Sequence, residues 1–355
     1  MKEKKVLMKG NEAMSEGAVM AGCRYFFGYP ITPQNEVPAY MAVRMPQVGG
    51  VFLQAESELA AINMVYGAAG AGARVMTSSS SPGISLKQEG ISYLVGAELP
   101  CVIANIMRGG PGLGGIQPGQ SDYFQAVKGG GHGDYRLLVL APDSVQEMAD
   151  LTMLAFDLAD LYRNPVMILG DGILGQMMEP VSFRKPRARK LPPKDWATTG
   201  AAGRPKNIIN SLYLVPEALE AHNLKLWKKF ETMKRKETRS EADVPPDCDL
   251  LLTAFGTTAR ICRGAVDELR RQGYKVGLLR PITLFPFPEK EIGDSASRVR
   301  AIMTVEMNMG QMVEDVRLAA AGRCPVHFYG RVGGMVPSVE EIVHEARKIL
   351  RGMEI

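Results

Sequence analysis

Between residues 20 and 180, short apolar runs alternate with longer amphipathic or small-residue stretches, and this alternation leaves few possible folds. Each apolar run ends at Gly, Pro, Ser or Thr. Runs this short are typical of strands, and the intervening stretches have the length of helices. The pattern therefore predicts a doubly wound, mostly parallel α/β sheet. The predicted strands are 25–28, 50–54, 75–78, 100–106, 136–140 and 165–169, and the predicted helices are 12–22, 33–45, 57–72, 83–97, 121–129 and 144–161.

After Asp171 the sequence becomes rich in Pro, Lys and Arg. Residues 182–205 show little apolar periodicity, so they are predicted to form an extended surface connection. A charged helix is predicted over 216–238, because Pro216 suits the first helical position and apolar residues follow near helical spacing.

The last hundred residues return to the α/β alternation. Four apolar runs, at 249–255, 275–279, 300–305 and 325–329, are separated by helical stretches at 258–272, 310–321 and 338–350. We therefore predict three parts. They are a larger α/β domain over 1–182, a basic connection with its charged helix over 183–246, and a smaller α/β domain over 247–355.

The charge distribution argues against a nucleic-acid-binding protein. The chain has 42 basic and 38 acidic residues, which give a formal net charge of +4. Thirteen of the basic and two of the acidic residues lie in 184–194 and 225–239, so the remaining 29 basic and 36 acidic residues give a charge of −7 elsewhere. Because the basic groups are concentrated in a predicted connection, binding of DNA or RNA is not expected.

Cysteine and histidine spacing argues against a metal site within this chain. The five cysteines form no CxxC motif, and the four histidines form no HxxxH or HExxH motif. No apolar run approaches the roughly 20 residues of a membrane-spanning helix, and no signal-peptide core is visible at the N-terminus. The protein is therefore predicted to be cytoplasmic, with reduced thiols and no membrane contact.

Polar and glycine-rich segments follow the first four predicted strands. They read YPITP (29–33), AESE (55–58), TSSSSPG (77–83) and RGGPGLGG (108–115). Ligands of open α/β sheets bind at the carboxyl ends of the strands, so these segments are expected to form one binding site.

Some of these residues also have a purely structural interpretation. Thr32 could cap a helix that starts at Pro33, and the acids of the second segment could complement the positive end of the helix that follows. The serine run 78–81 could be a turn, although a loop that enters a helix can also bind anions. Arg108 is harder to explain in this way, because a cation at the end of an apolar strand is costly to bury without an anion.

Taken together, the segments resemble a known family. The motifs GYPITPQNEVPAYM, QAESELAAINMVYGAAGAGA, SSSSPGISLKQEGISYLVGAELPCVIANIMRGGPG, RPITLFPFP and VEMNMGQ are similar to those of the α subunit of the 2-oxoacid:ferredoxin oxidoreductases. The similarity covers nearly the whole chain except 185–245. Within the family, the chain looks most like the branched-chain (2-oxoisovalerate) enzymes, with the 2-oxoglutarate enzymes next.

The resemblance implies a fold, cofactors and partners. Residues 1–180 are implied to hold the aminopyrimidine half of thiamine diphosphate, and 248–355 are similar to a transketolase C-terminal domain. Gly170-Asp171-Gly172 imitates the start of a diphosphate and Mg²⁺ motif, but no asparagine follows until Asn207, so we interpret it as a strand-ending turn. A β subunit is implied to hold the diphosphate and Mg²⁺, while γ and ferredoxin-like δ subunits would carry [4Fe-4S] clusters that pass electrons to ferredoxin.

The implied reaction is oxidative decarboxylation of a 2-oxoacid with coenzyme A, which gives an acyl-CoA and CO₂. Glu58 matches the family's catalytic glutamate, whose carboxyl group faces a ring nitrogen of the cofactor, and Glu56 is the weaker candidate. Thr32 and Arg108 match residues that contact the 2-oxoacid. The remaining cofactor contacts implied by the resemblance are Tyr29, Pro30, Ile31, Ser80, Pro82 and Gly83.

Two details and two alternatives complete these expectations. Ser79-Ser80 stands where many relatives have a glycine before the proline, so the backbone role of this loop is carried over loosely. Asn308 and Gln311 are expected at a domain or subunit interface.

A non-catalytic assembly subunit is the main alternative, although it would not need polar residues at three strand ends. A nucleic-acid-binding protein would require strongly salt-dependent binding.

Overall fold

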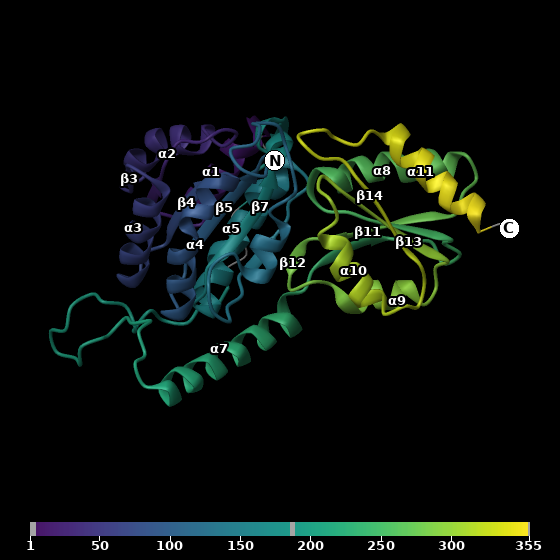
Figure 1. Cartoon of the computed structure of the whole chain (residues 1–355). Coiled ribbons are helices and arrows are strands. Elements are labelled where there is room, and N and C mark those ends of the chain that lie inside the picture. Colours follow the sequence, from purple (N-terminus) through teal and green to yellow (C-terminus); the bar gives the residue numbers. More distant parts are fainter. Residues whose placement is uncertain (1–4, 185–188, 354–355) are drawn as a thin grey trace.

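The computed structural model describes residues 5–184 and 189–353. Figure 1 shows two α/β units side by side, with a long helix and an extended loop along one side of the first unit. The first unit has a seven-stranded sheet with the order β12-β6-β7-β5-β4-β2-β3, and the second has a five-stranded sheet with the order β14-β13-β10-β11-β9. The predicted α/β fold with a larger and a smaller sheet is confirmed.

Six strands of the first sheet are parallel, and each comes from a predicted apolar run. They are β2 (Tyr25–Gly28), β3 (Val51–Gln54), β4 (Val75–Ser79), β5 (Val102–Met107), β6 (Leu138–Leu140) and β7 (Val166–Asp171). Every residue of β4 and β5 is buried, because helices cover both faces of a parallel sheet. The loops after β2, β4 and β5 therefore meet at one edge of the sheet.

The helices of this unit lie within three residues of the predicted spans. They are α1 (Gly10–Met20), α2 (Glu36–Gln47), α3 (Glu58–Gly70), α4 (Ser81–Gly96) and α5 (Val145–Tyr162). Ser57 caps α3 and Ser144 caps α5, each by accepting a backbone hydrogen bond at 3.2 Å. The predicted helix at 121–129 is instead a π-helical turn, η1 (Gln125–Gly129), which ends at the glycine run 129–131.

A short antiparallel pair of strands lies outside the two sheets and was not predicted. β1 (Val6–Lys9) pairs antiparallel with β8 (Met178–Val181), just after the five-residue helix α6 (Gly172–Gln176). Three of the four residues in each strand are exposed or half-buried, so neither strand forms a continuous buried face. Strands this short and this polar carry little sequence signal.

The basic connection contains the predicted charged helix, α7 (Pro216–Glu237). It begins at Pro216, and three basic residues in its last turn complement the negative end of the helix dipole. Lys229 lies 3.4 Å from Glu98, and Glu237 accepts a hydrogen bond from the Tyr162 hydroxyl at 2.8 Å. Since Glu98 precedes β5 and Tyr162 precedes β7, α7 packs against the amino-terminal edge of the first sheet.

The second unit contains the four predicted strands in parallel order. They are β10 (Leu250–Thr253), β11 (Val276–Pro281), β13 (Ala301–Glu306) and β14 (Val326–Gly330), and an unpredicted strand, β9 (Ser240–Asp243), pairs antiparallel with β11. The helices are α8 (Gly256–Arg271), α9 (Glu289–Ala296), α10 (Met312–Ala320) and α11 (Val339–Gly352). Of these, α9 was not predicted.

The segment after β11 joins the two units. β12 (Thr283–Phe285) leaves the second sheet and pairs antiparallel with β6 at the edge of the first sheet. Arg280 is 1% exposed and lies 2.5 Å from Asp143 and 2.7 Å from Glu147, which both belong to the first unit. A strand and a buried ion cluster therefore hold the two sheets together.

Asn308 and Gln311, which were expected at an interface, form a second contact between the two units. Asn308 donates to the carbonyl oxygen of Gln120 at 2.9 Å, and Gln311 donates to that of Ser121 at 2.7 Å. Both acceptors belong to the first unit. The prediction of an interface role is confirmed for the contact between the two units, whereas the predicted boundaries near 182 and 246 stay predictions.

Candidate active site

Glu58 is the first residue of α3 and is 5% exposed, whereas Glu56 faces solvent. The hydroxyl of Ser79, the last residue of β4, donates to Glu58 Oε1 at 3.4 Å. Gly83 faces the same carboxyl group, and a Cβ atom at this position would lie 2.4 Å from Glu58 Oε1. Only glycine therefore lets α4 approach Glu58 this closely.

Arg108 follows β5 and is 7% exposed. Its Nη1 donates to the carbonyl oxygen of Thr32 at 2.9 Å, and its Nη2 donates to that of Leu113 at 3.2 Å. Its Nε is buried without a hydrogen-bond partner, and no carboxylate of the described residues forms an ion pair with it. A buried guanidinium that contacts only neutral carbonyl groups is an incomplete anion site.

Thr32 does not cap a helix, because α2 begins at Glu36 with Asn35 as its N-cap. The side chain of Thr32 is half-buried, and its Oγ1 accepts a hydrogen bond from Asn35 at 3.2 Å. Tyr29, Pro30 and Ile31 precede it along a loop that stays partly exposed. An open cleft of about 470 Å³ adjoins Thr32.

The serine run is not a turn. Its members end β4 and begin α4, and Ser80 is the N-cap residue, with extended backbone angles. The Oγ of Ser80 is buried without a hydrogen-bond partner, and Pro82 lies in the first turn of α4. The Oγ of Ser81 accepts a hydrogen bond from the Arg108 amide at 3.1 Å, so the start of α4 and Arg108 are held together.

The contacts link all the predicted segments into one cluster. Thr32 contacts Arg108, Arg108 contacts Ser81, and the same turn of α4 carries Gly83 against Glu58. The cluster contains two orphaned buried groups, Arg108 Nε and Ser80 Oγ, and a glycine at a point of close approach. Unpartnered buried polar groups of this kind can be satisfied by a polar ligand.

Lys87 belongs to the same cluster and was missed from the sequence. It is fully buried, and its Nζ donates to Thr77 Oγ1 at 2.6 Å. Burial lowers the pKa of Lys87 to about 7, although the charge of Glu58 opposes this effect. A helical periodicity was available as a signal, because Lys87 shares one face of α4 with Gly83, Ile91 and Leu94.

Gly170-Asp171-Gly172 proves to be a helix cap. The Asp171 carboxylate accepts hydrogen bonds from the amides of Ile173 and Leu174, and also from the Thr257 hydroxyl at 2.7 Å. Asp171 therefore ends β7, begins α6 and contacts the second unit. The predicted strand end is correct, but a short helix follows it.

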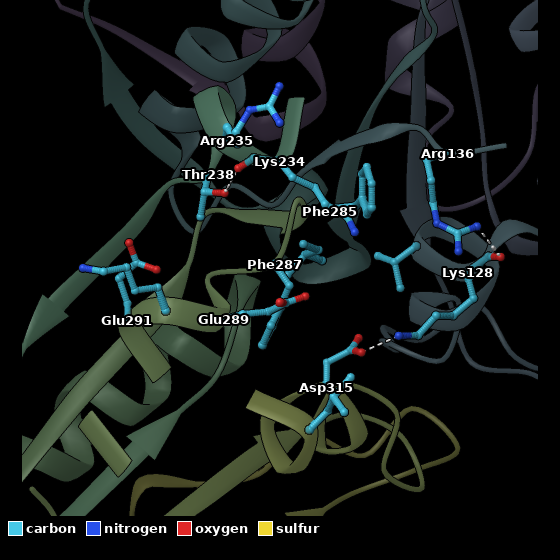
Figure 2. A pocket seen from close by; sticks show the side chains of 14 residues that line it. Lys128, Arg136, Lys234, Arg235, Thr238, Phe285, Phe287, Glu289, Glu291 and Asp315 are labelled. Carbon is cyan, nitrogen blue, oxygen red and sulfur yellow. Dashed lines mark hydrogen bonds and ion pairs between the residues drawn. The ribbon is translucent and has the colours of Figure 1, made fainter. Parts of the chain in front are cut away.

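A second cleft, of about 450 Å³, lies at the opposite edge of the first sheet (Figure 2). Lys128, Arg136, Lys234 and Arg235 line it together with Asp315, which pairs with Lys128. In Figure 2 the labelled basic side chains lie above and to the right of the cleft, and the acidic Glu289, Glu291 and Asp315 lie to the left and below. None of the sequence-predicted site residues lies there, so we place the candidate active site at the carboxyl edge.

Two family models match nearly the whole chain. Residues 16–240 match the thiamine diphosphate-binding model of the pyruvate flavodoxin/ferredoxin oxidoreductases, and residues 248–342 match core domain II of pyruvate:ferredoxin oxidoreductase. The ketoisovalerate oxidoreductase subunit VorB of Methanothermobacter marburgensis is 51% identical, over 97% of each chain. The chain belongs to the 2-oxoacid:ferredoxin oxidoreductase family.

Two further relatives are less similar to this chain. The 2-oxoglutarate synthase subunit KorA of Methanothermobacter thermautotrophicus is 37% identical, over 97% of this chain and 98% of that subunit. The 2-oxoglutarate:ferredoxin oxidoreductase of Magnetococcus marinus, solved with 2-oxoglutarate, coenzyme A and succinyl-CoA bound, is 29% identical with a TM-score of 0.89. This chain spans 98% of its own length in that match and 65% of the other chain.

The predicted transketolase-like architecture is also confirmed. A split-gene transketolase has the same fold with a TM-score of 0.61, over 96% of this chain and 97% of that chain, at 13% identity. The 2-oxoacid:ferredoxin oxidoreductase subunit and the thiamine diphosphate-binding fold predicted from the motifs are therefore both correct. No helix among the described residues is long and apolar enough to cross a membrane.

Proposed function

We propose that this chain is the α subunit of a thiamine-diphosphate-dependent enzyme that oxidatively decarboxylates a branched-chain 2-oxoacid such as 2-oxoisovalerate. Coenzyme A takes the acyl group, CO₂ leaves, and ferredoxin takes the electrons. The observation that carries the proposal is Arg108, a buried guanidinium with an unpartnered Nε next to Thr32. The substrate carboxylate provides the anion that this site lacks.

Glu58 would hold the proton at the pyrimidine ring nitrogen, because it is the buried carboxyl of the cluster, and Gly83 lets the start of α4 pack directly against it. Ser80 and the first turn of α4 contact the same ring, while Tyr29, Pro30 and Ile31 form its outer border. When bound, thiamine diphosphate supplies the nucleophilic carbon that attacks the 2-oxo group. Arg108 and Thr32 orient the 2-oxoacid by its carboxylate.

Partner subunits complete the active site. Every Asp171 contact described above is made within this chain, so the aspartate of the incomplete motif is already used as a cap and a junction. We therefore assign the diphosphate and Mg²⁺ to a β subunit. The described cysteines are free and mostly buried, which supports placing the [4Fe-4S] clusters on γ and ferredoxin-like δ subunits.

The branched-chain substrate is favoured because the relative named for ketoisovalerate is more similar than those named for 2-oxoglutarate. A 2-oxoglutarate enzyme is the alternative, and its substrate would bring a second carboxylate. A non-catalytic assembly subunit is the other alternative. The branched-chain proposal and these two alternatives predict different results in the same activity assay.

The test assembles the complex and assays a panel of 2-oxoacids with coenzyme A and a low-potential acceptor. We expect the highest kcat/KM with 2-oxoisovalerate. Arg108→Ala should lower kcat/KM for every 2-oxoacid by roughly 30-fold to several thousand-fold, because a desolvated charge pair is broken. Thr32→Ala should lower it less, since one hydrogen bond to a charged group is lost.

Arg108→Lys is the matched control and should recover only part of the activity, because an ammonium group cannot make the two-pronged contact. A variant that keeps full activity on one 2-oxoacid and loses it on another would show that Arg108 reads the side chain. A complex that turns over none of the panel would favour the assembly-subunit alternative.

A further inference from the structure

Lys87 lies in the middle of α4 without any exposed surface. Its hydrogen bond to Thr77 Oγ1, at 2.6 Å, is made to a neutral hydroxyl. Among the described residues no carboxylate lies within ion-pair distance of it. A lysine is almost never fully buried without a partner, because its ammonium group loses the hydration that water provides.

The position of Lys87 relative to Glu58 follows from the periodicities of the two elements. Lys87 is four residues after Gly83, so both lie on one face of α4. Thr77 is two residues before Ser79, so both point to one face of β4. The hydrogen bond between Lys87 and Thr77 therefore lies next to the hydrogen bond between Ser79 and Glu58.

Packing alone does not require a lysine at this position. Its neighbours on the same helix face, Ile91 and Leu94, are fully buried and apolar. The Cys101 thiol, before β5, and the Tyr135 hydroxyl also face this helix, and burial raises the pKa of both, so they are neutral near pH 7. Asp122, which precedes η1, accepts hydrogen bonds from Ser81 at the start of α4, at 2.7 Å, and from Asn105, at 2.9 Å.

Glu58 is therefore the remaining candidate for the anion that faces Lys87. Its negative charge acts to raise the pKa of Lys87. We propose that Lys87 is a positioning residue that serves as the buried counter-charge of Glu58. The inference rests on the proposed function, in which Glu58 holds a proton at the cofactor ring. When the cofactor is bound, the carboxyl group of Glu58 would share a hydrogen bond with that ring nitrogen.

This arrangement gives the site a dependence on pH. While Lys87 is protonated, the carboxylate of Glu58 is stabilised. When Lys87 loses its proton, the cluster loses the positive charge that faces Glu58. Turnover should therefore decline as pH rises through the titration of Lys87.

The first test needs no bound cofactor. The ε-carbons of lysine are labelled with ¹³C in the full chain, and the Lys87 signal is assigned by its loss in Lys87→Met. We expect a titration midpoint near 7. In Glu58→Gln the midpoint should fall by roughly one pH unit, because the anion that stabilises the ammonium group is gone. An unchanged midpoint would overturn the inference.

Lys229 provides the matched control. It is also largely buried, its pKa is lowered to about 8 by burial, and it pairs with Glu98 at the opposite edge of the sheet. Its signal should not respond to Glu58→Gln. If Lys87→Met does not fold, Thr77→Val replaces it. That variant removes the hydroxyl acceptor with little change of shape and should also lower the Lys87 midpoint.

The second test uses the assembled complex. Lys87→Met should lower kcat about 10-fold below pH 7, the size expected for the loss of one nearby charge, and should remove the decline at higher pH. Lys229→Met should keep the wild-type pH profile. A wild-type profile in Lys87→Met would contradict the inference.

Glu58→Gln separates this inference from the proposed function. If that complex keeps full activity, the role proposed for Glu58 is wrong whatever Lys87 does. If it loses activity while Lys87→Met matches wild type at every pH, only the counter-charge role of Lys87 is wrong.

Discussion

Burial distinguishes the proposed site residues of this chain from others of the same type. Glu56 and Glu58 stand two positions apart in one motif, but only Glu58 is buried, at the positive end of α3. Arg108 is buried without a carboxylate partner, whereas Arg280 is buried among three acids. A charge removed from water interacts more strongly with a single ligand group than an exposed one does.

Glu58→Gln tests the acid directly. The amide keeps the shape but cannot exchange a proton, so turnover of the complex should fall roughly 10²-fold or more. Cofactor binding should change less. The rate of C2 proton exchange, followed by NMR, measures the step concerned. Glu56→Gln is the matched control and should behave as wild type, and the reverse result would assign the role to Glu56.

Lys87 also predicts how the stability of the chain depends on pH. Its pKa is about 7 in the folded chain and 10.5 ordinarily, so between these values the unfolded chain binds a proton that the folded chain does not. The free energy of unfolding should therefore rise with pH in this window, by up to about 1.4 kcal/mol per pH unit.

Urea unfolding at pH 7 and pH 9 checks this. The free energy of unfolding of Lys87→Met minus that of wild type should be about 2 kcal/mol larger at pH 7 than at pH 9. The corresponding window for Lys229 begins near pH 8, so Lys229→Met should show a smaller change. Parallel behaviour of Lys87→Met and wild type would mean that Lys87 stays charged in the folded chain.

The sequence predicts the location of residues that follow strands, but it does not reveal residues that are buried within helices. Thr32, Glu58 and Arg108 stand at strand ends, where topology alone brings them to one edge. Lys87 was missed because a lysine in a polar-looking helix is normally solvated. Its burial follows from the close approach of α4 to Glu58 at Gly83, which only the assembled structure shows.

Strands and helices with a continuous apolar signal were located within a few residues, and the others were missed. β1, β8, β9 and β12 are each three or four residues long and lie at edges or outside the main sheets. Their partners are far away in the sequence. Such strands form because a neighbouring edge offers hydrogen bonds, so local pattern does not reveal them.

Arg280, which precedes β12, tests the junction that these short strands create. Arg280→Met leaves Asp143 with fewer partners in a buried place, and the free energy of unfolding should fall by about 3 kcal/mol. Denaturant unfolding measures this change. Arg300→Met is the control, because Arg300 is half-exposed and 3.9 Å from Asp249, so it should have little effect. Equal stabilities of the two variants would show that the ion cluster does not hold the units together.

The relatives of this chain are subunits of multi-subunit oxidoreductases, and we propose that partner subunits complete its active site. Purified alone, it should be colourless and should bind thiamine diphosphate weakly, because the groups for the diphosphate and for iron are assigned to partners. Iron analysis and calorimetric titration with the cofactor and Mg²⁺ provide the measurement. Stoichiometric iron, or tight Mg²⁺-dependent binding by the isolated chain, would contradict this division of labour.

The pairing of β12 with β6 has a consequence for how the polypeptide can be divided. The connection between the units is long and, over 190–214, has no helix or strand. β12, the strand that holds the two units together, follows this connection in the sequence. It completes a sheet whose other strands precede the connection. A protease cut within the connection should therefore leave two fragments that remain associated, and the two halves could be encoded by separate genes without loss of the fold.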